Sequence, residues 1–303
     1  MLSIFKKYQE KVLSASFKEE TEHVVIWISI CSFILHVALI EAVDLGLLKI
    51  PFQSELLTNH ISAIYTPFSF ILLFEVYLLV FHIPKSTSTY IAKQYEIITL
   101  IIIRRIFKDL ANLDLSINWF EDKYDLQFTY DIVSTLILFL LIYFFHRLHN
   151  KQSAQKEVSD LPLKIQKFIE RKRLIASLLV PVILFMAVYT FVNWSGDLLV
   201  GWQGNLEEAS SFSDINNIFF DEFFTVLIMT DVLLLLFSFF HTTEFHVFIR
   251  NSGFIISTIL IRISFSIEGI LNNALIIVSV LFGVLILWIT QKYSQVDEEK
   301  LEV

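Results

Sequence analysis

Eight long apolar runs constrain the fold of this chain more than any other feature of its sequence. A helix needs about 20 mostly apolar residues to cross the ~30 Å hydrocarbon core of a membrane. The chain is 55% hydrophobic and only 18% charged, whereas soluble domains carry about 25% charged residues. The sequence therefore predicts an all-α integral membrane protein with about eight transmembrane helices. The runs occupy residues 24–46, 61–83, 94–112, 129–147, 174–194, 219–240, 252–270 and 274–291.

Lysine and arginine residues gather on one side of the predicted membrane. With the N-terminus in the cytoplasm, most of the 23 basic residues fall in cytoplasmic segments, and the outside loops hold only Lys49 and Lys123. Such an excess of lysine and arginine is typical of the cytoplasmic segments of membrane proteins. We therefore expect a multi-pass protein of a bacterial-type inner cell membrane, with both termini in the cytoplasm.

The two halves of the chain repeat the same order of features. Each half begins with a basic amphipathic stretch, Ser3–Phe17 or Leu163–Lys172, and continues with four apolar runs. Because four is an even number, both halves would have the same orientation, as in a parallel repeat. We predict two four-helix membrane units, residues 1–150 with an N-terminal amphipathic helix and residues 151–303 with a preceding basic amphipathic helix.

Opposite charges occur twice inside these apolar runs. In the first half, Glu75 is followed by Arg104 and Arg105 in the next run. In the second half, Asp231 is followed by Arg262 in the next run. Charges near the bilayer centre are costly and normally pair or face water. Counted from the cytoplasmic ends of the predicted spans, acid and arginine lie at similar depth near mid-membrane, so we expect buried acid–arginine pairs.

Three roles for these pairs remain open. A buried ion pair can fix the packing of helices without taking part in any chemistry. It can instead line a hydrated constriction that gates or selects ions, or its acid can relay protons when the arginine moves away. Voltage sensing is disfavoured, because Arg104 and Arg105 are adjacent and Arg262 is alone, whereas a sensor repeats arginine over several turns.

The second half, and less closely the first, resembles the phosphate-starvation-inducible E (PsiE) membrane family. The resemblance rests on Asp231-Val232-Leu233, on the aromatic-rich turn from His241 to Arg250, and on an Ile-rich run around Arg262; Phe74-Glu75 fits the acidic position in the first half. The resemblance implies a small four-span fold, and the family has no established biochemical activity. This chain departs from the family by its doubling, by aspartate at 231 in place of the usual glutamate, and by two arginines at 104 and 105.

Two further groups of polar residues are candidate sites. His36, Glu41 and Asp44, near the outer end of the first run, are predicted to line a vestibule; His36 and Glu41 are five residues apart, which does not suit a metal site on one helix face. The basic segment before the fifth run is predicted to contact anionic lipid or a soluble protein, since each basic residue near a membrane surface contributes about 1 kcal/mol. Its members are Lys164, Lys167, Arg171, Lys172 and Arg173.

Several function classes find no support in the sequence. There is no glycine-rich phosphate loop, no His-Glu-x-x-His run and no nucleophile motif, so we expect neither an enzyme nor a bound cofactor or metal. The net charge of −8, with basic residues beside the spans, argues against nucleic-acid binding. The single cysteine, Cys31, excludes a disulfide within the chain.

These observations lead to two hypotheses. The first is an ion-conducting or ion-responsive membrane element, assembled as a homo-oligomer because one four-helix unit is too narrow for a wide pore. The alternative is a non-conducting membrane scaffold, or a stress or defence accessory protein, that recruits a cytoplasmic protein partner.

Overall fold

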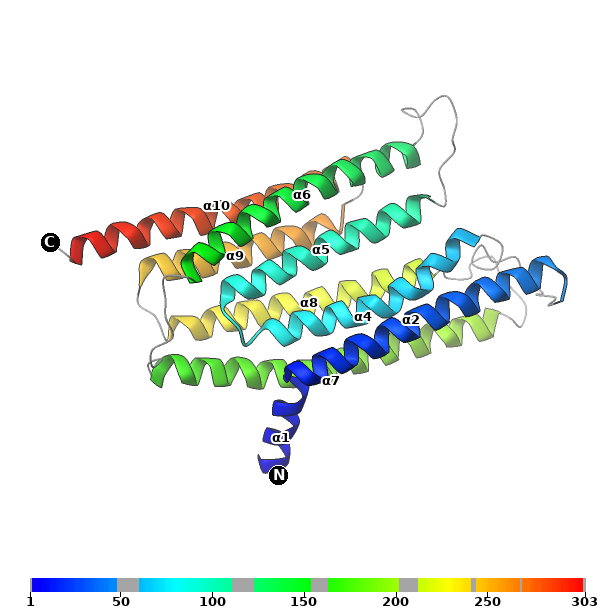
Figure 1. Cartoon of the computed structure of the whole chain (residues 1–303), viewed down its shortest axis with the longest axis horizontal. Coiled ribbons are helices and arrows are strands. Elements are labelled where there is room, and N and C mark those ends of the chain that lie inside the picture. The colour runs from blue at the N-terminus through cyan, green and yellow to red at the C-terminus, as the bar shows by residue number, and fades with distance from the viewer. Residues whose placement is uncertain are drawn as a thin grey trace. The chain divides into compact units, whose positions relative to one another are not determined.

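A computed structural model describes residues 2–47, 60–110, 123–153, 163–201, 212–240, 244–267 and 269–301. Within these ranges the ordered elements are nine α-helices and one 3₁₀ helix, and they include no strand (Figure 1). The elements are α1 (Leu2–Val12), α2 (Ala15–Asp44), η1 (His60–Ile64), α4 (Tyr65–His82), α5 (Thr87–Leu110), α6 (Lys123–Ser153), α7 (Leu163–Gly201), α8 (Phe212–Phe239), α9 (Phe245–Ser264) and α10 (Ile270–Leu301). The prediction of an all-helical chain is therefore confirmed for the described residues.

Six of these helices are long and apolar enough to cross a membrane. They are α2, α6, α7, α8, α9 and α10. A chain with this many apolar helices is a multi-pass membrane protein, because spanning helices satisfy their backbone hydrogen bonds internally. The helix α4 is apolar but shorter, with its apolar part at Thr66–His82, and α5 carries charges along its length. Membrane crossing by these two helices stays a prediction.

Several helices have other bounds than the predicted spans. Serine 86 starts α5, since its side-chain oxygen accepts a hydrogen bond of 3.2 Å from the Thr89 backbone N–H. The helix α9 begins at Phe245 rather than near residue 252, and it ends at Ser264, so that Arg262 lies in its last turn. The predicted depth of Arg262 near mid-membrane stays a prediction.

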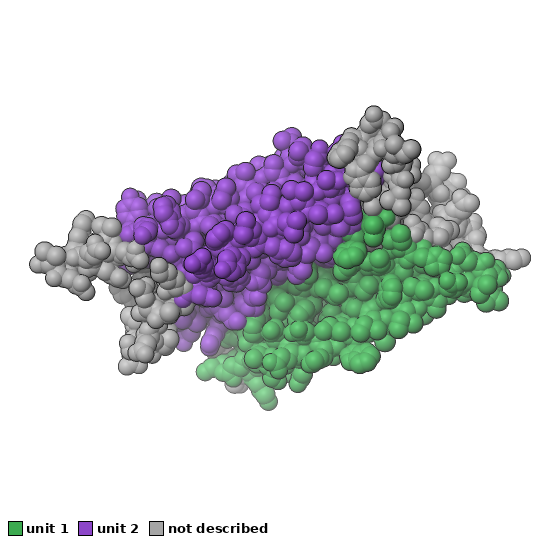
Figure 2. All heavy atoms as spheres, turned by 45° about the horizontal axis from the view of Figure 1, so that its top comes forward, with its two compact units in different colours: residues 1–81, 107–113, 176–225 green, residues 82–106, 114–175, 226–303 purple. Residues whose placement is uncertain are grey.

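The chain forms two compact units, which Figure 2 shows in different colours. Unit 1 contains Met1–Phe81, Phe107–Leu113 and Ala176–Thr225; unit 2 contains His82–Ile106, Asp114–Ile175 and Val226–Val303. These units are not the two halves of the sequence, because each combines segments from before and after residue 150. The tandem repeat of residues 1–150 and 151–303 stays a prediction.

Unit 1 ties the N-terminal helix α1 to its neighbours through main-chain carbonyls. Ser14 caps α2, its side-chain oxygen accepting a 3.1 Å hydrogen bond from the Phe17 backbone N–H. The Tyr77 hydroxyl of α4 donates to the Val12 carbonyl at 2.9 Å, which satisfies an orphan carbonyl at the end of α1. One hydrogen bond therefore holds the end of α1 and another holds the start of α2.

Unit 2 packs α5, α9 and α10 closely through small residues. A Cβ atom at Gly253 of α9 would lie 2.8 Å from side-chain carbons of Ile286 in α10. The buried Tyr95 hydroxyl of α5 lies 2.7 Å from the Ser257 hydroxyl of α9, and Ser257 donates to the Ser279 carbonyl of α10 at 2.7 Å. Small residues and hydroxyl bonds of this kind are the usual means of helix association in membranes.

The outward faces of the apolar helices are themselves apolar. Exposed large side chains include Leu35 of α2, Leu136 and Leu140 of α6, Phe185 of α7 and Val278 of α10. A soluble protein would bury such a surface, whereas acyl chains solvate it without cost. The exposed residues therefore indicate a lipid environment for these helices.

Candidate functional site

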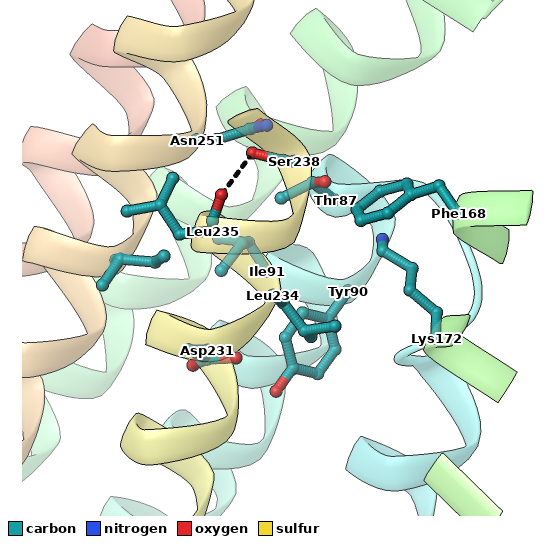
Figure 3. A pocket seen from close by; sticks show the side chains of 11 residues that line it. Thr87, Tyr90, Ile91, Phe168, Lys172, Asp231, Leu234, Leu235, Ser238 and Asn251 are labelled. Carbon is teal, nitrogen blue, oxygen red and sulfur yellow. Dashed lines mark hydrogen bonds between the residues drawn. The ribbon is translucent and has the colours of Figure 1, made fainter. Parts of the chain in front are cut away.

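A small cavity in unit 2 brings together an acid and a base from different helices (Figure 3). The α5 helix supplies Tyr90, α7 supplies Lys172, α8 supplies Asp231 and α9 supplies Asn251. The centre of a water molecule can move within a volume of about 30 Å³ in this cavity. At least ~10–15 Å³ by this measure is needed to hold one water, so the cavity can accommodate water but not a bulky ligand.

Both charged side chains of the cavity are buried. Asp231 is 3% exposed and Lys172 is 5% exposed. The Gln94 side-chain amide of α5 donates to Asp231 Oδ2 at 3.2 Å. Lys172 Nζ donates to the Lys85 carbonyl at 3.0 Å and lies 5.0 Å from the centre of the Phe168 ring. Polar groups of the protein therefore contact both charges directly.

The charges around the cavity act on one another. The Lys172 ammonium group stabilises the carboxylate of Asp231 electrostatically, while Arg250 of α9 repels Lys172. Glu244, just before α9, partly offsets the charge of Arg250. Because the effective dielectric constant is low inside a protein, these interactions are stronger than they would be in water. Asp231 and Arg250 therefore act on the Lys172 ammonium group in opposite directions.

Two buried polar atoms at this site, Gln94 Oε1 and Asn251 Oδ1, lack a hydrogen-bond partner among the described residues. Figure 3 shows the Tyr90 ring beside Asp231, and its hydroxyl interacts with that carboxylate and with the Gln94 side chain. Buried polar atoms are nearly always bonded to protein or to ordered water. Protein groups alone therefore do not supply hydrogen-bond partners for all the buried polar atoms at this site.

A second buried charge pair in unit 2 joins Arg105 of α5 to Asp131 of α6. Arg105 donates to both carboxylate oxygens of Asp131, with 2.7 Å from Nη2 to Oδ1. Arg105 Nη1 also donates to Asn272 Oδ1 of α10 at 2.9 Å, and Asn273 Nδ2 donates to Asp131 at 2.6 Å. Asp131 is completely buried. Both charges are therefore compensated by a bidentate pair with additional hydrogen bonds.

The two sites lie at different levels of α5. Gln94, which contacts Asp231, precedes Arg105 by eleven residues, or about 16 Å along a helix. Between them, Glu96 contacts His146 of α6 at 2.7 Å and Lys93 of α5. The helix α5 therefore carries a series of polar contacts along unit 2.

The structure pairs Arg105 with a different acid from the one that the sequence predicted. The carboxylate bound to Arg105 is Asp131, which sequence reasoning missed because residue 131 lies in a run that was treated as plainly apolar. Glu75 is buried in α4, in unit 1, whereas Arg104 belongs to α5 of unit 2. Pairing of Glu75 with Arg104 stays a prediction.

Asp231 and Arg262 lie at different levels of adjacent helices. Asp231 lies eight residues before the end of α8, about 12 Å from the connection to α9. Arg262 lies seventeen residues after the start of α9, about 25 Å from the same connection. The proposed pairing of these residues stays a prediction that this offset does not favour. Gln94 and Lys172, which the pairing argument did not include, are the groups that the structure places around Asp231.

The predicted vestibule residues separate into two environments in unit 1. His36 is buried, and its Nδ1 is hydrogen bonded to the Thr66 hydroxyl. Glu41 and Asp44 are exposed at the end of α2, where His60 Nε2 lies 3.1 Å from Glu41 and 4.0 Å from Asp44. His60 was missed because it follows a long connection. Among the described residues, no group of three or more His, Cys, Asp or Glu side chains is suited to hold a metal.

The predicted basic contact surface on α7 is divided by the helix. Lys167, Arg171 and Arg173 are exposed, whereas Lys172 is buried at the cavity. The side chain of Lys164 lies outside the described residues. Because successive residues point about 100° apart on a helix, one member of a basic run can face the interior while its neighbours face outward.

Comparison of the chain with family models, curated proteins and solved structures finds no match. The resemblance to the PsiE family therefore stays a prediction.

Proposed function

We propose that this multi-pass membrane protein is an ion-responsive or ion-conducting element, with Asp231 and Lys172 as its ionisable centre. The observation that carries the proposal is a buried acid and a buried base around one water-sized cavity. Ionisable groups inside membrane-spanning helices are rare because they are costly, and those that occur commonly mark ion or proton pathways.

The contrast with the Arg105–Asp131 pair supports this assignment. Asp131 receives hydrogen bonds from Arg105, Gln127 and Asn273, so its carboxylate has its acceptor capacity filled. Such a pair serves to hold helices in register. Asp231 accepts a hydrogen bond from Gln94, interacts with the Tyr90 hydroxyl and lines a cavity. A carboxylate with room beside it is better suited to change its charge or to meet an ion.

The test is flux into liposomes that contain the purified protein. A potential set by potassium and valinomycin would drive ion entry, which internal dyes for protons or sodium would report. We expect flux above that of empty liposomes and its loss in Asp231→Asn. Glu20→Gln, a change of a carboxylate to an amide at an exposed position of α2, is the matched control and should leave flux unchanged. Protein that carries no ion under any pH or potential would contradict conduction.

The exposed basic side chains of α7 favour a second candidate function. Lys167, Arg171 and Arg173 present positive charge on one segment, as expected for a scaffold that recruits an acidic cytoplasmic partner or anionic lipid. In this case Lys167→Gln, Arg171→Gln and Arg173→Gln together would release a copurifying partner, while Asp231→Asn would leave it bound. A homo-oligomer remains part of either proposal, and cross-linking in the membrane would test it.

A further inference from the structure

The cavity beside Asp231 has the lining of a water site. Gln94 Oε1 and Asn251 Oδ1 are buried without partners among the described residues, and Asn251 lines the cavity together with Tyr90 and Asp231. A buried water typically makes about three hydrogen bonds to otherwise unsatisfied polar groups. The available space of about 30 Å³ exceeds the minimum of ~10–15 Å³ for one water.

The same cavity is unsuited to a metal cation. An ion such as sodium or potassium would need several oxygen ligands, whereas the residues that line the cavity include one carboxylate, that of Asp231. The Lys172 ammonium group, which lines the cavity, would also repel a second cation at this distance. The site therefore suits a water molecule better than a metal cation. The ion that bound water can deliver to Asp231 is the proton.

We infer that water held in this cavity exchanges protons with Asp231, so that the proton is the ion to which the protein responds. The role of the proton as the ion to which the protein responds rests on the proposed function. The presence of water in the cavity does not depend on ion flux. In the exchange step a hydronium ion transfers one proton to a carboxylate oxygen of Asp231, leaving a water molecule and a neutral carboxylic acid. The reverse step returns the proton to water.

Protonation of Asp231 would change the balance of charges around Lys172. The groups that face Asp231 are Tyr90 and Gln94 from α5 and Lys172 from α7. The cation that α9 places near Lys172 is Arg250. Once the carboxylate is neutral, repulsion between Lys172 and Arg250 is no longer offset by Asp231. Since Lys172 and Arg250 lie on α7 and α9, the change of charge would alter the electrostatic interaction between these two helices.

Hydration of the cavity is tested by radiolytic footprinting of the wild-type protein in lipid nanodiscs. X-ray radiolysis produces hydroxyl radicals from water in place, so that buried side chains beside bound water are oxidised. Tyr90 and Tyr95 are a matched pair on α5, being 3% and 0% exposed, but the Tyr95 hydroxyl is bonded to Ser257. We expect Tyr90 to be oxidised several times faster than Tyr95. Equal protection of both tyrosines would mean a dry cavity and would overturn the inference.

Proton exchange is tested with a hydrophobic carbodiimide, which reacts with a protonated carboxyl group within a membrane protein. Labelling of Asp231, measured by mass spectrometry of peptides, should increase as the pH falls. Asp131, which is completely buried and bonded to Arg105, is the internal control and should stay unlabelled. Labelling of Asp231 that does not change with pH would overturn proton exchange. Hydration and pH-dependent labelling without any flux would retain this inference and reject conduction.

Discussion

Gly283 of α10 lies directly against the hydroxyl group of Tyr95 of α5, so closely that a Cβ atom at position 283 would overlap the Tyr95 oxygen. The approach allows Tyr95 to reach Ser257 of α9 at 2.7 Å. Three helices of unit 2 are therefore joined through one position that has no side chain. In membranes, where apolar burial drives little association, such close contacts carry much of the packing energy.

We predict that Gly283→Ala destabilises the protein by about 1–3 kcal/mol, the usual cost of overpacking a closely packed interior. The expected result is a lower midpoint of thermal unfolding in detergent. Tyr95→Phe, which removes the overlapping oxygen, should recover part of the loss when combined with Gly283→Ala, because the two changes act on the same contact. Leu285→Ala, at an exposed position of the same helix, is the control. Equal effects of Gly283→Ala and Leu285→Ala would contradict the close contact.

The bond between Arg105 and Asp131 gives a second prediction. Asp131→Asn leaves Arg105 with an amide instead of a carboxylate, and removing one partner of a buried ion pair costs about 3–5 kcal/mol. The side chain of Arg105 is 26% exposed, so the lower end of this range is expected. Denaturant unfolding in mixed micelles would measure the loss.

A double change provides the control for this pair. Arg105→Met together with Asp131→Asn should be less destabilising than Asp131→Asn alone, since no unpaired charge remains in the interior. A double variant at least as unstable as the sum of the two single variants would show that the charges do not act on each other.

The apolar runs were sufficient to predict most of the fold. Each predicted span overlaps a described helix, and six of these helices are long and apolar enough to cross a membrane. The ends were less predictable, because a helix can continue beyond the residues that would lie in the hydrocarbon region. The helix α9, for example, begins at Phe245 rather than near residue 252.

The candidate site was only partly predictable, because it depends on which helices are neighbours. Asp231 was recognised from its charge within an apolar run. Lys172 was assigned to a basic surface, since the sequence does not indicate which face of α7 is covered. Asp131 receives its donors from Arg105 and from Asn273 of α10, which is 142 residues away in the sequence. Helical periodicity shows which residues share a face, but it does not show what that face meets.

Tyr77 gives a prediction about unit 1. Tyr77→Phe removes the 2.9 Å hydrogen bond to the Val12 carbonyl and keeps the aromatic contact with Phe17. We expect a loss of about 1 kcal/mol, confined to the junction of α1 and α2. Hydrogen exchange in nanodiscs should be faster in residues of α1 and unchanged in α10. A uniform increase in exchange over the whole chain would show instead that Tyr77 supports the fold globally.

The last prediction concerns the coupling of Lys172 to Asp231. Lys172→Met removes the cation that stabilises the Asp231 carboxylate while keeping most of the length and apolar surface of the side chain. The protein should lose stability at neutral pH, because a buried carboxylate without a counter-charge is costly. Asp231→Asn in the Lys172→Met background should restore part of that stability, giving an interaction energy of roughly 1–3 kcal/mol in a double-mutant cycle. Lys167→Met, at an exposed position of α7, should show no coupling to Asp231. An interaction energy equally small for Lys172 and Lys167 would contradict an electrostatic link across the cavity, and with it the assignment of Lys172 and Asp231 to one ionisable centre.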